Sequence, residues 1–141
     1  MYKEILDKLP YARPFLFVDE LLHIDENGAE GTFTFSADLD FYSGHFKNNP
    51  VTPGVILTET MAQIGVVCLG IYLLGNDYNN ETKIAFTSSN IEFLDAVFPD
   101  EIVRVISKKL YFRFGKLKCE VTMFNASGKE VCRGTIAGMI L

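Results

Sequence analysis

The chain has 141 residues, which predicts a single domain over residues 1–141. Its 48% hydrophobic and 22% charged residues are typical of a globular protein and not of a disordered one. The formal charge of −5 argues against a nucleic-acid partner, because nucleic-acid binding needs a basic face.

The N-terminal half predicts a short helix and two strands before a long loop. Asp, Asn, Gly and Pro are frequent in the loop, whereas Phe33 and Phe35 alternate with polar residues in the second strand. The expected elements are a helix at Tyr2–Leu9 ended by Pro10, strands at Leu16–Ile24 and Glu30–Ala37 joined by a turn at Asp25–Gly28, and a loop at Asp38–Pro53.

One long helix is predicted from Gly54 to Leu74. Pro53 suits the first turn, Thr52 is an acceptable cap, and Gly75 with Asn76 supplies the end. This helix is apolar nearly all round, which indicates burial in the core.

A membrane span is the competing interpretation of this helix, since about 20 apolar residues cross a bilayer. However, Thr58, Glu59, Thr60 and Gln63 interrupt its first half, and the uninterrupted apolar run of 64–74 is too short to span. A carboxylate at the centre of a bilayer is also costly. We therefore expect a core helix and no membrane association.

The remainder of the chain predicts only strands and turns. The expected strands are Thr82–Phe93, Glu101–Ser107, Lys109–Phe114, 117–123 and Glu130–Leu141, with turns at Gly115-Lys116 and 125–128; the second and third can join into one. Two strands, one buried helix and about four further strands predict an α+β fold, in which a sheet wraps around one long central helix.

Three cysteines, Cys68, Cys119 and Cys132, are far apart and form no C-x-x-C pair. This pattern predicts buried, reduced thiols in a cytoplasmic protein, without a disulfide framework or a zinc site. The N-terminus has no long apolar core and does not read as a secretory signal. His23, among acidic residues at a strand end, is expected on the surface, and two distant histidines give no metal motif.

The segment from Ser43 to Gln63 carries the chemistry. His45 is its only side chain that titrates near neutral pH and can accept a proton there. Gly54 opens the helix, where unpaired N–H groups and the helix dipole favour developing negative charge. Glu59 follows about 7–8 Å along the axis, at 1.5 Å per residue. Burial should raise the pKa of Glu59 and keep it a proton donor.

Each of these residues also has an ordinary structural interpretation. A lone loop histidine is most often a surface or hydrogen-bonded residue, and a lone helix glutamate usually faces water or pairs with a base. It is their combination around a Pro-Gly helix start that favours a proton-transfer site.

At these residues the sequence resembles the 3-hydroxyacyl-[acyl-carrier-protein] dehydratases of fatty-acid synthesis. The resemblance lies in LPYARPFLFVDELL at Leu9–Leu22 and GHFKNNPVTPGVILTETMAQ at Gly44–Gln63, and continues weakly through Phe93–Glu101. It implies the hot-dog fold, in which an antiparallel sheet wraps around one long central helix. It also implies no metal or organic cofactor, and a homodimer or trimer of dimers with active sites at the subunit interface.

The resemblance also implies residue roles. His45 would take the C2 proton, Glu59 would protonate the departing C3 hydroxyl, and the Gly54 N–H would polarise the thioester carbonyl. Phe46 and helix side chains such as Val55 would line an apolar acyl tunnel. The substrate would be carried as an acyl-carrier-protein or CoA thioester.

Several positions depart from this family. Tyr11-Ala12 replace a His-Arg pair, Leu94-Asp95 replace a basic pair, and 47–49 replace a Pro-Gly-His. Basic residues suit the docking of an acidic carrier protein, because opposite charges steer association. A replacement basic patch is one interpretation of a group of cationic residues later in the chain, and a solvated strand face is the other: Lys108, Lys109, Arg113, Lys116 and Lys118. These departures suggest a specialised relative that serves a polyketide, polyene or lipid pathway.

Two other functions remain open from the sequence. A hot-dog thioesterase would use the same helix start with a carboxylate that activates water. A non-catalytic acyl-binding subunit of a multi-enzyme complex would fit the altered basic positions but not the intact pair of His45 and Glu59.

Overall fold

The computed structural model describes residues 2–141, which form one sheet and one interrupted helical rod. The α-helices are α1 (Lys3–Asp7), α2 (Gly54–Ala62) and α3 (Cys68–Leu74), and the shorter helical turns are η1 (Asp40–Ser43), η2 (Gln63–Val67) and η3 (Gly75–Asp77). The strands are β1 (Glu20–Asp25), β2 (Gly28–Phe35), β3 (Ile84–Phe93), β4 (Glu101–Arg113), β5 (Lys116–Phe124) and β6 (Glu130–Ile140).

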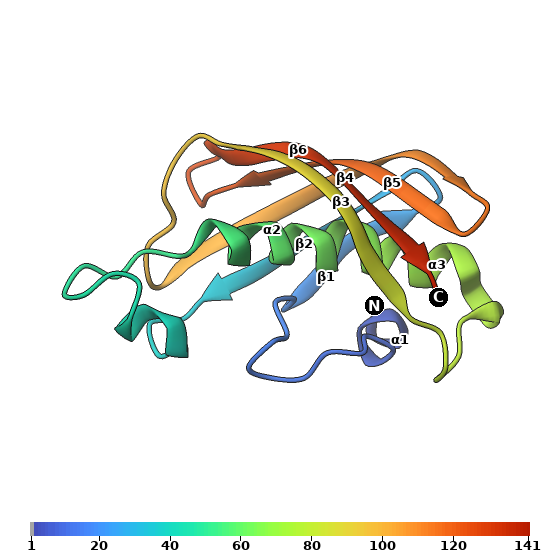
Figure 1. Cartoon of the computed structure of the whole chain (residues 1–141), viewed down its shortest axis with the longest axis horizontal. Helices are drawn as coiled ribbons and strands as arrows, with labels where there is room; N and C mark the ends of the chain where they lie inside the picture. The colour runs from blue at the N-terminus through green and yellow to red at the C-terminus, as the bar shows by residue number, and fades with distance from the viewer. Residues whose placement is uncertain (1) are drawn as a thin grey trace.

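The six strands pair antiparallel in the order β1-β2-β4-β5-β6-β3. Figure 1 shows this sheet arched over the rod that α2, η2 and α3 form. The predicted hot-dog architecture is therefore confirmed. The two edges of the sheet are β1 and β3.

The rod is buried because apolar side chains surround it. Leu57, Met61, Ile64 and Leu69 are each at most 2% exposed. Residues 54–77 are long and apolar enough to cross a membrane by length and composition alone, but 72% of the apolar window is buried inside the fold. The helix therefore serves as the core of this domain.

Gly65 allows the rod to lie close to the sheet. A Cβ at this position would stand 3.0 Å from the Ser107 Cβ and 3.2 Å from a methyl of Val121. The hydrogen bonding of the rod widens to a π-helical turn across Gln63–Val67, a feature that the periodicity did not predict.

The predicted first strand is wrong over residues 16–19, because β1 begins only at Glu20. Phe17 is buried as expected, but its N–H donates to the side chain of Gln63 at 2.8 Å and not to a neighbouring strand. Its ring packs edge-to-face on Phe33 at 5.6 Å between centroids. This stretch is therefore an extended segment, held by the helix at Phe17 and by β2 at Asp19, whose N–H donates to the Thr32 carbonyl at 2.9 Å.

Other boundaries differ by a few residues. The helix α1 is shorter than predicted, and β2 begins at Gly28. The two runs in 101–114 join into the single strand β4, as the sequence allowed. The predicted turn at Gly115-Lys116 is centred one residue earlier, because Phe114 and Gly115 take positive φ while Lys116 pairs with Arg113.

The three cysteines are free and buried, as predicted. Burial raises the pKa of the Cys68 thiol to about 12, so it stays protonated at neutral pH. His23 lies on the surface, also as predicted, where its ring contacts Asp25 at 2.9 Å and lowers the pKa of that carboxyl.

Candidate functional site

The loop between β2 and α2 presents His45. Its backbone N–H donates to the carbonyl of Phe41 at 3.0 Å, and its own carbonyl accepts from the Val51 N–H at 2.8 Å. The imidazole stacks on the ring of Phe46, with 4.0 Å between centroids. These contacts fix the position of His45 in the middle of this loop.

The carbonyl of Val51 also fixes the tautomer of His45. The His45 Nδ1 lies 2.9 Å from this oxygen, which can only accept, so Nδ1 carries the proton in this contact. The neutral ring then has its lone pair on Nε2. His45 is thus arranged as a proton acceptor.

The start of α2 offers unpaired backbone donors. Pro53 is the N-cap residue and no side chain caps the helix. Thr52 does not cap it, contrary to expectation, because its hydroxyl is hydrogen bonded to the phenol of Tyr42. Among residues 2–141 no backbone acceptor faces the N–H groups of Gly54 or Val55. Such donors suit a developing oxyanion.

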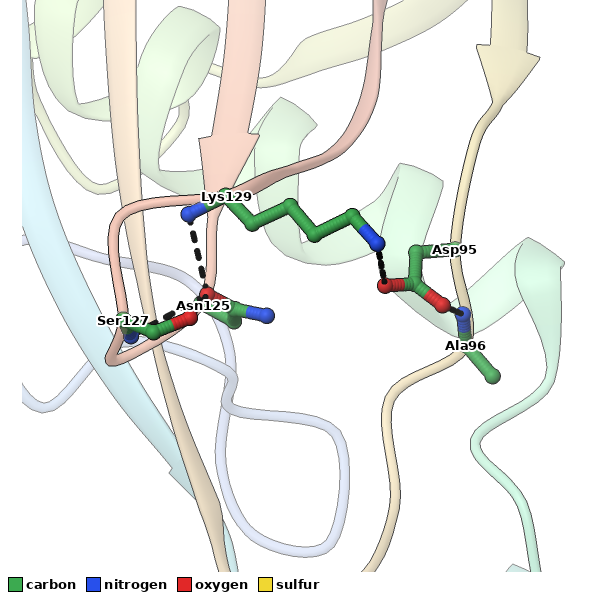
Figure 2. A network of polar contacts seen from close by, with 5 residues as sticks. All are labelled: Asp95, Ala96, Asn125, Ser127 and Lys129. Carbon is green, nitrogen blue, oxygen red and sulfur yellow. Dashed lines mark hydrogen bonds and ion pairs between the residues drawn. The ribbon is translucent and has the colours of Figure 1, made fainter.

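A second loop holds this helix start in place. The Thr52 N–H donates to the Val97 carbonyl at 2.8 Å. Figure 2 shows how the loop that contains Val97 is anchored: Lys129 pairs with Asp95 at 3.1 Å, and the Asn125 side chain accepts from the turn that carries Lys129. The turn between β5 and β6 therefore supports the loop that positions Gly54.

Glu59 lies half-buried on α2, and burial raises the pKa of its carboxyl. The side-chain amide of Gln63 donates to it at 3.0 Å and lowers the pKa in part. The same amide donates to the Phe15 carbonyl at 3.0 Å. Gln63, itself fully buried, thus orients the carboxyl and ties it to the N-terminal segment.

Gly54 and Glu59 open onto one groove of about 750 Å³, whose floor is α2 and whose wall is β3. Val55 and Thr58 contribute from the helix, whereas Phe86 and Phe93 contribute from the strand. The Phe93 ring lies so close to Gly54 that a Cβ there would stand 3.1 Å from it. The groove therefore joins the donors of the helix start to the carboxyl in partly apolar surroundings.

His45 and Phe46 are not among the residues that line this groove. Phe46 is 55% exposed, and Val55, which the sequence assigned to substrate binding, is 76% exposed. Within one chain the structure brings Gly54, Val55 and Glu59 together and leaves His45 and Phe46 outside.

Sequence reasoning missed three contributors to the site. Gln63 was noted as a polar residue in an apolar helix and as the end of the family motif, without a role, although an amide four residues after a carboxyl is a signal for pairing on one helix face. Phe93 was noted only as the start of the weak resemblance over Phe93–Glu101, and no local pattern marks Phe86. Within residues 2–141, no three or more His, Cys, Asp or Glu side chains gather as metal ligands.

The sheet wrapped around one helix places this chain in the hot-dog class, and solved structures share this fold. A dehydratase heterocomplex named ApeI:P from Xenorhabdus doucetiae aligns with a TM-score of 0.79 and 14% identity, over 96% of this chain and 89% of that one. A hypothetical thioesterase with coenzyme A from Streptococcus pneumoniae TIGR4 aligns with a TM-score of 0.69 and 16% identity, over 100% of this chain and 97% of that one.

The family follows from sequence comparison. Residues 9–137 match the model of the FabA-like domain, and the chain belongs to the FabA-like family. Two curated relatives are both named 3-hydroxyacyl-[acyl-carrier-protein] dehydratase FabZ, a hydro-lyase. The relative from Caldicellulosiruptor bescii is 31% identical over 94% of this chain and 93% of its own length. The relative from Sinorhizobium fredii is 32% identical over 99% of this chain and 88% of its own length.

Proposed function

We propose that this protein dehydrates a 3-hydroxyacyl thioester, carried by an acyl carrier protein, to the trans-2-enoyl thioester. The pathway is the synthesis of fatty acids or of a related polyketide or polyene. The observation that carries the proposal is the groove in which an unpaired helix start and a carboxyl of raised pKa lie together.

In the proposed reaction the thioester carbonyl accepts hydrogen bonds at the start of α2, where the N–H groups of Gly54 and Val55 meet no backbone acceptor from the described part of the chain. The Nε2 atom of His45 takes a proton from C2. The electron pair of that C–H bond forms the double bond to C3 as the C3–O bond breaks. Glu59 gives its proton to the departing hydroxyl, which leaves as water.

The site needs a second copy of this chain, because His45 does not line the groove of its own Glu59. The edge strand β3 has one free side, and the exposed side chains Val55, Phe86 and Phe93 line the groove. Phe46 is exposed on the loop that precedes α2. We propose a homodimer, or a trimer of dimers, in which His45 of one subunit reaches Glu59 of the other.

The cationic side chains expected as a replacement patch lie on the hairpin of β4 and β5. Figure 1 places this hairpin at the opposite end of the helical rod from Gly54. They therefore do not surround the groove of their own chain. The buried, unpaired thiols support a reducing, cytoplasmic location for the enzyme.

The decisive experiment supplies 3-hydroxyacyl thioesters on both acyl carrier protein and CoA, and measures enoyl product and free thiol. We expect enoyl product, with His45→Ala and Glu59→Gln each lowering kcat/KM by roughly 10²–10⁴-fold. Tyr72→Ala, on the far part of the helix, is the control and should keep parent activity. Thiol release without enoyl product, or equal activity in all four proteins, would overturn the proposal.

A further inference from the structure

A second, smaller cavity adjoins the groove at Glu59, between the helical rod and the sheet. This inner cavity has a volume of about 40 Å³. Its walls are Ala62 and Val66 on the helix, the first residues of β3, and the last part of β6. Glu59 and Phe86 belong to the lining of both spaces. They therefore stand at the boundary between the open groove and the inner cavity.

The residues of the helical rod show how the groove and the inner cavity are arranged along it. Gly54, Thr58 and Glu59 face the groove, whereas Glu59, Ala62 and Val66 face the inner cavity. Gly54, Thr58, Ala62 and Val66 follow one another four residues apart, and Glu59 lies beside Thr58 and three residues before Ala62, so they form one stripe on the helix surface. A ligand whose thioester lies at the helix start would thus extend its chain past Glu59 into the inner cavity.

Tyr11 lines the inner cavity from outside the helix and the sheet. It belongs to the segment between α1 and β1, and its ring lies 6.3 Å from that of Phe15. Burial, together with the nearby Glu59 carboxyl, raises the pKa of Tyr11 to about 12, so the phenol is neutral at physiological pH. The segment is itself fixed, because Gln63 binds Phe15 and Phe17.

We propose that the ring of Tyr11 limits the length of the acyl chain that this enzyme accepts, by closing the inner cavity. The inference rests on the proposed function and adds a substrate class to it, namely short acyl chains. A cavity of about 40 Å³ holds roughly three water-sized groups, since about 10–15 Å³ holds one. Only a few carbon atoms beyond C3 fit there while the ring is in place.

The proposal predicts a change of chain-length preference in Tyr11→Ala. Each additional methylene that becomes buried improves binding by roughly fourfold. We therefore expect the ratio of kcat/KM for the 3-hydroxydodecanoyl thioester to kcat/KM for the 3-hydroxybutyryl thioester to rise by roughly tenfold or more. Tyr11→Leu, with a side chain of intermediate size, should give an intermediate ratio and provides a second variant if Tyr11→Ala folds poorly.

The controls separate the ring from its hydroxyl. Tyr11→Phe keeps the ring and should leave the ratio within about twofold of the parent, as should Tyr72→Ala, which changes an exposed tyrosine away from the cavity. An unchanged ratio in both Tyr11→Ala and Tyr11→Leu overturns the proposal. A shift in Tyr11→Phe as large as that in Tyr11→Ala also overturns it, because the hydroxyl and not the ring would then set the preference.

A binding measurement keeps this test independent of the reaction. Calorimetry with saturated S-alkyl thioethers of CoA, of graded chain length, reports the depth of the cavity without turnover. A parent that dehydrates no substrate would overturn the proposed function alone. Affinities that follow chain length in the same way for parent and Tyr11→Ala would overturn the role of Tyr11 alone.

Discussion

The carboxyl of Glu59 lies among apolar side chains, and its ionisation is therefore coupled to folding. Burial raises its pKa in the folded protein above the value in the unfolded chain, although the hydrogen bond from Gln63 acts the other way. The folded state thus holds the proton more tightly. The stability that this contributes is complete below the unfolded pKa and is lost as the pH rises through the folded pKa.

This coupling predicts that Glu59→Gln stabilises the protein at alkaline pH. The variant removes a charge that is costly to bury and retains an oxygen that accepts from Gln63. We expect its Tm to exceed that of the parent above neutrality, with the difference shrinking in acid. Thermal unfolding across the pH range measures it, and Glu81→Gln, at an exposed position, should show no such trend. A larger gain in acid than in alkali would contradict the argument.

The same raised pKa predicts the alkaline side of the pH–rate profile. As the proposed proton donor, Glu59 must be protonated, so kcat/KM falls as the pH rises through the pKa of this carboxyl. In Gln63→Met the carboxyl loses the hydrogen bond that favours its charged form, and the fall should move to higher pH. Steady-state kinetics over the pH range test this, and a move to lower pH would argue against Glu59 as the acid.

At the scale of elements, one side chain connects the helix to the N-terminal segment. Gln63 is fully buried and binds the N–H of Phe17 and the carbonyl of Phe15. Replacing it with Met leaves the buried Phe17 N–H without its partner and removes the tie to the Phe15 carbonyl. We expect a loss of roughly 1–3 kcal/mol in the free energy of unfolding, measured with denaturant.

The control for this prediction is Thr60→Val on the same helix. Thr60 is equally buried, but its hydroxyl donates to the Ile56 carbonyl, which lies within the helix. Its loss should cost no more than about 1 kcal/mol. If Gln63→Met were no more destabilising than Thr60→Val, the connection would not contribute to stability.

The close approach of the helix to the sheet yields a further prediction. In Gly65→Ala the new methyl would stand 3.0 Å from the Ser107 Cβ and 3.2 Å from a methyl of Val121, and both of these side chains are buried. Overpacking of this kind should destabilise the fold by about 1–3 kcal/mol, despite the better helix propensity of alanine. Gly44→Ala, where no atom lies within 4 Å of the added Cβ, should change stability by no more than about 0.5 kcal/mol.

The difference between local and distant contacts explains what the sequence could predict. His45, Gly54 and Glu59 fall within fifteen residues, so the loop and the helix start could be recognised from one segment. The two strand residues of the groove, Phe86 and Phe93, join it only through the pairing of β3 with β6, which no local periodicity encodes.

The misplaced first strand has a similar cause. Residues 16–19 show the apolar pattern of a strand, and Phe17 and Val18 are indeed buried. The distinction between a strand and an extended segment lies in where the backbone hydrogen bonds go. Here the Phe17 N–H is bonded to a side chain 46 residues away, and the sequence does not reveal that partner.

At the scale of the whole molecule, the proposed site is divided between two subunits, and this division is open to a direct test. His45→Ala and Glu59→Gln should each be inactive as homodimers. In a two-fold dimer whose site takes His45 from one subunit and Glu59 from the other, a mixed dimer of the two variants has one complete site. After refolding an equal mixture, we expect about a quarter of the parent activity, since about half of the dimers are mixed.

A substitution on the edge strand β3 tests whether the activity of the mixed dimers depends on contact between two β3 strands. Ser88 is exposed near the middle of β3, so Ser88→Lys would place like charges near each other if two β3 edges pair. Added to both inactive variants, it should lower the recovered activity and the proportion of dimer in sedimentation. Thr34→Lys, on β2, adds the same charge away from that edge and should lower neither. Recovery unaffected by Ser88→Lys would place the contact elsewhere, and no recovery at all would mean that each subunit must complete its own site.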